Sequence, residues 1–476
     1  MKKILLTLSL FLFSIQSYSI ELEPNHLKKI KVVKNWEPVA DFEALKEYAS
    51  LIPIDELWAM YNNALNCTER LAKADPFPTM EPVDSLPPIY SKINMNLTDS
   101  FAFCQGYVHG WANRKPKILG DVLLRWASAT EDPMVFKPTT RTNSPNSGGY
   151  QIPSVLGSFA QSYAIWYNEI DYTAEERKQV DAYLTRKLME QIFEPINYGF
   201  KPCDINIDIE NISAMSEDAK WGWNNCGNAR RRAAIGEIML GFRLEDQKLL
   251  DKGHDDLYLE QSFINKDGIN INQSMRGGSN INYSWDASHD ISLLVEIYDS
   301  VGYDYLEHTL PRGAKIHEYL SFIYKLMKDF KLTASWAKYD VGSVSNPYAE
   351  IKDLSQEQFQ LLGENGRYAY RDGDKHFVKS HTKFVKRYMP DIYFNGVKDY
   401  KMIVNNMSYQ QNGMRGIYPY TLHYANNSKE ENAKAEKQKT GIEHWSDSSV
   451  CAWFKASNGK EAAPRIEVSN RGISCN

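Results

Sequence analysis

The residues best suited to acid–base chemistry stand in the segment MRGGSNINYSWDASHD, residues 275–290. Arg276 and two glycines precede Tyr283, and an apolar helical pattern begins only beyond that tyrosine. A free tyrosine has a pKa of about 10, and a nearby cation favours its phenolate. We therefore predict that Arg276 and Tyr283 act together as a catalytic pair, with the glycines allowing a tight turn before the helix.

Further polar residues recur in a fixed order around this segment. The chain shows in turn Asn224-Asn225, Asp267-Gly268, Arg276-Gly277, Tyr283 and Gly302-Tyr303-Asp304-Tyr305. This order, with seven residues from Arg276 to Tyr283, resembles the alginate lyases of polysaccharide lyase family 5 and its relatives. The resemblance is clearest over 150–310. Where those lyases carry two histidines this chain has Cys226 and Ser284, so a sister family is an equal alternative.

The resemblance implies an all-α (α/α) toroid that cleaves an acidic polysaccharide by β-elimination without a cofactor or metal. Alginate is the expected substrate, and glucuronan or another uronate polymer is the nearest alternative. Such a reaction needs donors that neutralise the sugar carboxylate, and Asn225 and Arg276 are suited to that role. Tyr283 would act as both acid and base.

Six more residues are candidates for substrate binding, each with a structural alternative. Asn224 could donate to the sugar or could cap a helix, and Trp221 and Trp223 could stack on sugar rings or fill the core. The proline-rich loop at 76–93 stands where the resembling lyases have a lid over the cleft, which makes Tyr90 a candidate contact, and a rigid surface connector is the alternative. Gln151 follows a polar loop, and His289 is favoured as a structural histidine over a supporting one. Arg230, Arg231 and Arg232 indicate a solvated or salt-bridged helix face.

The rest of the chain indicates helix pairs joined by polar loops, which favours an all-α toroid or solenoid. Helices are expected at 153–170, 173–193, 226–243, 245–265, 281–302 and 304–330. Thr173 and Glu176 predict a capping box at the start of one of them. Three regions follow: a signal peptide at 1–19, the toroid at 20–390, and an irregular C-terminal extension at 391–476 that could include strands.

The N-terminal residues also predict the compartment. Lys2 and Lys3 precede a short apolar run and a small-residue cleavage site, so we expect a periplasmic or secreted protein with no stable membrane insertion. Six cysteines allow 15 pairings, among which we favour the neighbours 67–104, 203–226 and 451–475. The formal net charge of −5 argues against a nucleic-acid partner. We expect a monomer that binds an anionic polysaccharide.

Two other functions remain open at this point. A glycoside hydrolase would need two carboxylates across the scissile bond, for which Glu237 and Asp286 are available without any supporting spacing. A polysaccharide-binding protein on a decayed lyase fold would explain the two absent histidines. The turn at Asp267-Gly268 lacks the acidic ligands of a calcium loop.

Overall fold

The structure, a computed structural model, describes residues 22–37, 117–129, 156–190 without 158, 166 and 169, 203–211, 226–340, 348–355, 377 and 381–392. Within these ranges the chain is helical and has no strand, and only the isolated bridges Ile264–Asn270 and Thr309–Lys315 pair extended residues. The all-α prediction is thus confirmed. The predicted signal peptide and nearly all of the predicted C-terminal extension lie outside the described residues.

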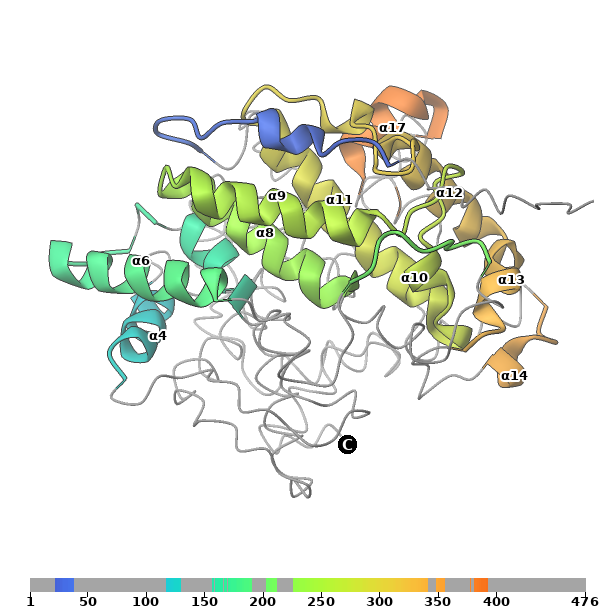
Figure 1. Ribbon diagram of the computed structural model, residues 1–476, viewed down its shortest axis with the longest axis horizontal. Coiled ribbons are helices and arrows are strands. Elements are labelled where there is room, and N and C mark those ends of the chain that lie inside the picture. The colour runs from blue at the N-terminus through green and yellow to red at the C-terminus, as the bar shows by residue number, and fades with distance from the viewer. Residues whose placement is uncertain are drawn as a thin grey trace, which may run out of the picture.

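Helices of very different length make up this part of the chain (Figure 1). The longer ones are α4 (Lys117–Ala127), α6 (Ala174–Met189), α8 (Asn228–Arg243), α9 (Gln247–Gln261), α11 (Asn280–Asp299) and α12 (Ile316–Lys328). The short ones are η1 (His26–Lys29), α10 (Ile271–Ser274), η5 (Gly277–Ser279), η6 (Tyr305–Glu307), η7 (Phe330–Thr333), α13 (Ala334–Ala337), α14 (Tyr348–Ile351) and α17 (Thr382–Tyr388).

Helices α8 and α9 form a tight antiparallel hairpin and lie side by side in Figure 1. Asp246 caps α9 by accepting hydrogen bonds from the backbone amides of Lys248 and Leu249. A Cβ atom at Gly253 would stand 2.8 Å from the side chain of Ile238, so only glycine allows the two helices to approach this closely. Packing against α9 thus fixes the position of α8, including its first turn, which carries the three consecutive arginines.

Two clusters of buried side chains hold the helices together. One cluster joins α4, α6 and residues 156–165 around Trp126, Phe159 and Tyr163. The larger cluster contains the facing sides of α8, α9, α11 and α12. At the start of α6, Thr173 and Glu176 form the predicted capping box. Among the described helices, none is both long and apolar enough to cross a membrane.

One helix was predicted too long. The expected helix at 304–330 is instead the single turn η6, a bridged turn between Thr309 and Lys315, and then α12. Gly313 within that turn has a φ of 93°, which no helix accommodates. The apolar spacing around the turn hid this interruption, although Pro311 and Gly313 are typical of one.

Candidate active site around Arg276 and Tyr283

The turn between α10 and α11 brings Arg276 and Tyr283 together. Gly277 has a φ of 52°, the left-handed conformation that favours glycine, and it starts the η5 turn that leads into α11. Gly278 does not share this positive φ. Tyr283 then falls in the first turn of α11, which begins at Asn280. Only one of the two glycines is therefore required by the backbone conformation.

Arg276 packs against the ring of Tyr283. The guanidinium carbon of Arg276 lies 4.9 Å from the ring centroid of Tyr283. Arg276 is 5% exposed and its Nε atom has no hydrogen-bond partner among the described residues, whereas Tyr283 is partly exposed. A cation at this distance from the ring centroid interacts favourably with the face of the ring. The structure thus brings the two predicted residues into contact, and their role in proton transfer stays a prediction.

The other predicted catalytic residue, Asn225, lies outside the described residues, as do Asn224, Trp221, Trp223, Tyr90 and Gln151. The residue that follows Asn225 is described. Cys226 is fully buried and forms a disulfide with Cys203, with 5.2 Å between their Cα atoms. This confirms one predicted pairing, while the pairings 67–104 and 451–475 lie outside the described residues. Cys226, where the resembling lyases have histidine, is thus a covalent anchor just before α8.

The segment 203–211 that carries Cys203 is held at several further points. The Nη2 atom of Arg312 donates to the carbonyl oxygens of Ile205 at 3.0 Å and Ile207 at 3.1 Å. Its Nε atom donates to the carbonyl oxygen of Ser262, at the end of α9. The disulfide therefore links this tethered segment to the residue that starts the described chain before α8.

His289 is 1% exposed and lies in an aromatic cluster. Its ring centroid is 4.7 Å from that of Trp285 and 5.8 Å from that of His381. Burial lowers the pKa of His381 well below its usual value, so that ring is neutral. This environment agrees with the structural role favoured for His289, and a role in substrate binding stays a prediction.

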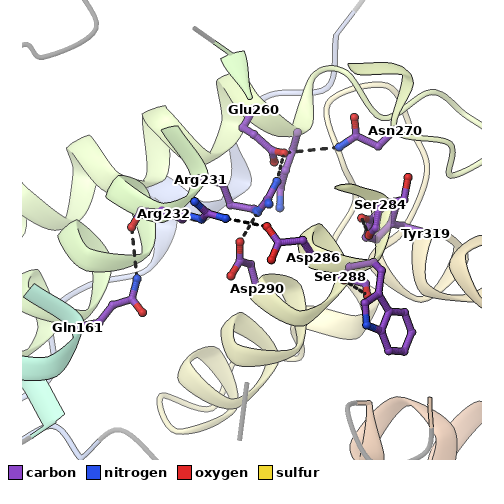
Figure 2. Close-up of polar contacts among 12 residues, drawn as sticks. Gln161, Arg231, Arg232, Glu260, Asn270, Ser284, Asp286, Ser288, Asp290 and Tyr319 are labelled. Atoms are coloured by element: carbon purple, nitrogen blue, oxygen red, sulfur yellow. Dashed lines mark hydrogen bonds and ion pairs between the residues drawn. The ribbon is translucent and has the colours of Figure 1, made fainter. Parts of the chain in front are cut away.

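The three consecutive arginines of α8 were expected to form a solvated or salt-bridged face, and the solvated alternative is wrong (Figure 2). Arg231 is fully buried, with Nη1 donating to Glu260 at 2.7 Å and Nε donating to Asp290 at 2.8 Å. Arg232 donates from Nη2 to Asp286 at 2.8 Å, and Arg230 pairs with Asp256.

The carboxylate partners of these arginines were not identified from the sequence. Asp286 and Asp290 lie three and seven residues beyond Tyr283, which is the spacing of one helix face. A helical-wheel comparison of α8 and α11 could have suggested the pairing. Which carboxylate meets which arginine depends on the packing of the two helices.

The two carboxylates considered for a hydrolase belong to separate ion pairs. The Nζ atom of Lys252 lies 2.5 Å from Glu237 on one side of α8, and Arg232 binds Asp286 on another. Burial raises the pKa of Glu237 to about 8. Glu237 and Asp286, both within the described part of the chain, are thus bound to different cations and are not shown as a facing acid and base. Among the described residues, no cluster of three or more His, Cys, Asp or Glu could hold a metal ion.

Comparison with known proteins agrees with the sequence resemblance. The family described as alginate lyase matches residues 204–331, a range that includes Arg276 and Tyr283, and this confirms the resemblance. No curated protein sequence matches the chain.

Solved structures of alginate lyases are also similar to the chain. The crystal structure of alginate lyase A1-III from Sphingomonas species A1 matches at 18% identity and a TM-score of 0.47, over 68% of this chain and 87% of that one. A histidine-to-alanine variant of that enzyme, complexed with a tetrasaccharide, matches at 18% identity and a TM-score of 0.45. The match covers 71% of this chain and 88% of the variant's chain.

Proposed function

We propose that this chain, whose residues 204–331 match the alginate lyase family, is a polysaccharide lyase that acts on a uronate polymer, most of all alginate. The observation that carries the proposal is the contact of Arg276 with Tyr283, at 4.9 Å, inside the matched range. A buried cation against a partly exposed tyrosine is an arrangement suited to removing a proton from an anionic sugar.

The difficult step in such a reaction is removal of the proton at C5 of the uronate. The adjacent carboxylate is charged, and further negative charge must build there as the proton leaves. Donors already held in place stabilise this charge, and loss of one such donor commonly costs about 3–4 kcal/mol. We assign this role to Asn225, through its amide, and to Arg276, through its guanidinium.

Tyr283 would perform both proton transfers. As phenolate it takes the C5 proton, the C4–C5 double bond forms, and the C4–O4 bond breaks. The phenol then returns the proton to O4 of the departing chain, which requires C5–H and O4 to lie on the same side of the ring. Because Cys226 is bonded to Cys203 and position 284 is serine, Tyr283 is the acid–base candidate of this segment.

The proposal is tested by incubating the full protein with alginate, polymannuronate, polyguluronate and glucuronan. The new C4–C5 double bond absorbs ultraviolet light, so the increase in absorbance reports elimination directly. Mass spectrometry of the products separates elimination from hydrolysis, since hydrolysis adds water and leaves no unsaturated end. Binding of a polymer without any absorbance change would support the binding-protein alternative and contradict the lyase.

We also propose that the protein is exported after cleavage of residues 1–19. The basic start and apolar run support this, and so does the disulfide between Cys203 and Cys226, because disulfides persist mainly in oxidising compartments. N-terminal sequencing of protein recovered from periplasm or medium should read from Ile20. Retention of residues 1–19 on the recovered protein would contradict cleavage.

A further inference from the structure

Two consecutive arginines of α8 bind two carboxylates on the face of α11 that begins at Tyr283. Arg232 donates to Asp286 and Arg231 to Asp290, each at 2.8 Å, and Figure 2 shows both contacts crossing between the helices. Asp286 and Asp290 follow Tyr283 by three and seven residues, so the three side chains lie along one stripe of the helix. The arginines therefore fasten to α8 the face of α11 that carries the tyrosine.

The Arg232–Asp286 pair is the member of this network nearest to Tyr283 along α11. The side chain of Asp286 is 6% exposed and that of Arg232 is 15% exposed. Residues three apart on a helix have Cβ atoms about 5–6 Å from each other. A carboxylate one helical turn from Tyr283, if it lost the cation bound to it, would disfavour both a phenolate at Tyr283 and the approach of an anionic sugar.

We propose that Arg232 and Asp286 are positioning residues for the elimination reaction. Their ion pair holds the first turns of α11 against α8 and compensates the charge of Asp286, which lies one helical turn from Tyr283. This inference rests on the lyase function proposed above. Neither residue is assigned a contact with substrate.

Among the described residues, charged and titratable groups lie near this part of α11 on several elements. They are Arg276 from the preceding turn, Arg231 from α8, Glu260 from α9, Tyr319 from α12 and Asp290 from α11, while His289 on another side of α11 contacts His381. Arg231 is shared by Glu260 and Asp290, and burial raises the pKa of Tyr319, which stays neutral. Asp286 also interacts electrostatically with Arg231 and Tyr319, so the double variant is needed to separate the Arg232–Asp286 pair from these neighbours.

The test uses Arg232→Met, Asp286→Asn and the double variant, with kcat and KM measured on the polymer that the wild type cleaves, across pH. Arg232→Met removes the cation that is hydrogen-bonded to Asp286. The ascending limb of the pH profile of kcat/KM should therefore move to higher pH by about 0.5–1 unit. Asp286→Asn leaves an arginine without its carboxylate, so the limb should move to lower pH. The double variant should return it close to the wild-type position.

Lys383→Met is the matched control, because Lys383 binds Glu296 at 2.7 Å near the far end of the same helix. It should lower thermal stability without moving the limb. Single variants that move the limb in the same direction, or leave it in place, overturn the inference when the wild type is active. If one single variant does not fold, the direction of the other still decides. Absence of wild-type turnover on every uronate polymer contradicts the proposed function, and this inference with it.

Discussion

Arg276 lies over the ring of Tyr283 with its guanidinium carbon 4.9 Å from the ring centroid, although the η5 turn separates the two residues in the chain. The left-handed φ of Gly277 starts this turn, so a glycine, an arginine and a tyrosine form one local unit. The contact gives a structural reason for the arginine and the glycine turn that precede Tyr283 at the start of α11.

Tyr283→Phe should reduce kcat by about 10²–10⁴-fold, because the variant keeps the ring but has no group to carry the proton. KM should change little, since packing against Arg276 is retained. Tyr258→Phe is the control, because the Tyr258 hydroxyl donates to the carbonyl oxygen of Glu23, remote in sequence from the site. Absorbance assays on alginate compare the two, and full activity of Tyr283→Phe would rule out the mechanism while leaving the fold intact.

Arg276→Met should reduce kcat/KM by about 10²–10³-fold, through loss of a donor to the developing charge on the carboxylate. The same change removes the cation that favours the phenolate, so the ascending limb of the pH profile should move to higher pH. Arg276→Lys keeps a positive charge but loses the planar guanidinium. Its pH profile should therefore lie close to that of the wild type, while its kcat/KM should stay reduced. Equal pH profiles for all three proteins would show that Arg276 does not act on Tyr283.

Cys203→Ser combined with Cys226→Ser should lower the free energy of unfolding by about 3 kcal/mol, since the bond closes a loop across 23 residues. Denaturant titration measures the difference. Because the disulfide anchors the chain next to Asn225, activity at temperatures where the variant is fully folded should also fall. Unchanged activity there would limit the disulfide to a role in stability.

Acid should destabilise the protein through His254. Burial lowers the pKa of this imidazole to about 3, and neither ring nitrogen has a hydrogen-bond partner among the described residues. Unfolding restores a pKa of about 6.5, so the unfolded state binds the extra proton as the pH falls. Stability should therefore decrease from about pH 6.5 downward to about pH 3. Denaturant titrations of His254→Leu at pH 7 and pH 4 should show a smaller decrease than the wild type, and an equal decrease would contradict the assignment.

The sequence alone was sufficient wherever a local pattern dictates the conformation. The capping box of Thr173 and Glu176, the positions of α8, α9 and α11, and the pairing of Cys203 with Cys226 all agree with expectation. The order of Arg276 and Tyr283 likewise pointed to the alginate lyase family, whose match spans both. Such features depend on neighbours in the chain, so periodicity, caps and spacing reveal them.

Only the tertiary structure decided which distant groups meet. The arginines at 231 and 232 looked like a polar helix face. Instead Arg231 is fully buried and Arg232 is partly buried, because Glu260, Asp286 and Asp290 reach them from two other helices. A charged side chain is stable inside a protein only when such partners surround it, and helix packing supplies them. Sequence spacing thus brought Arg276 to Tyr283, whereas the packing of α8 against α11 determined the charges around that pair.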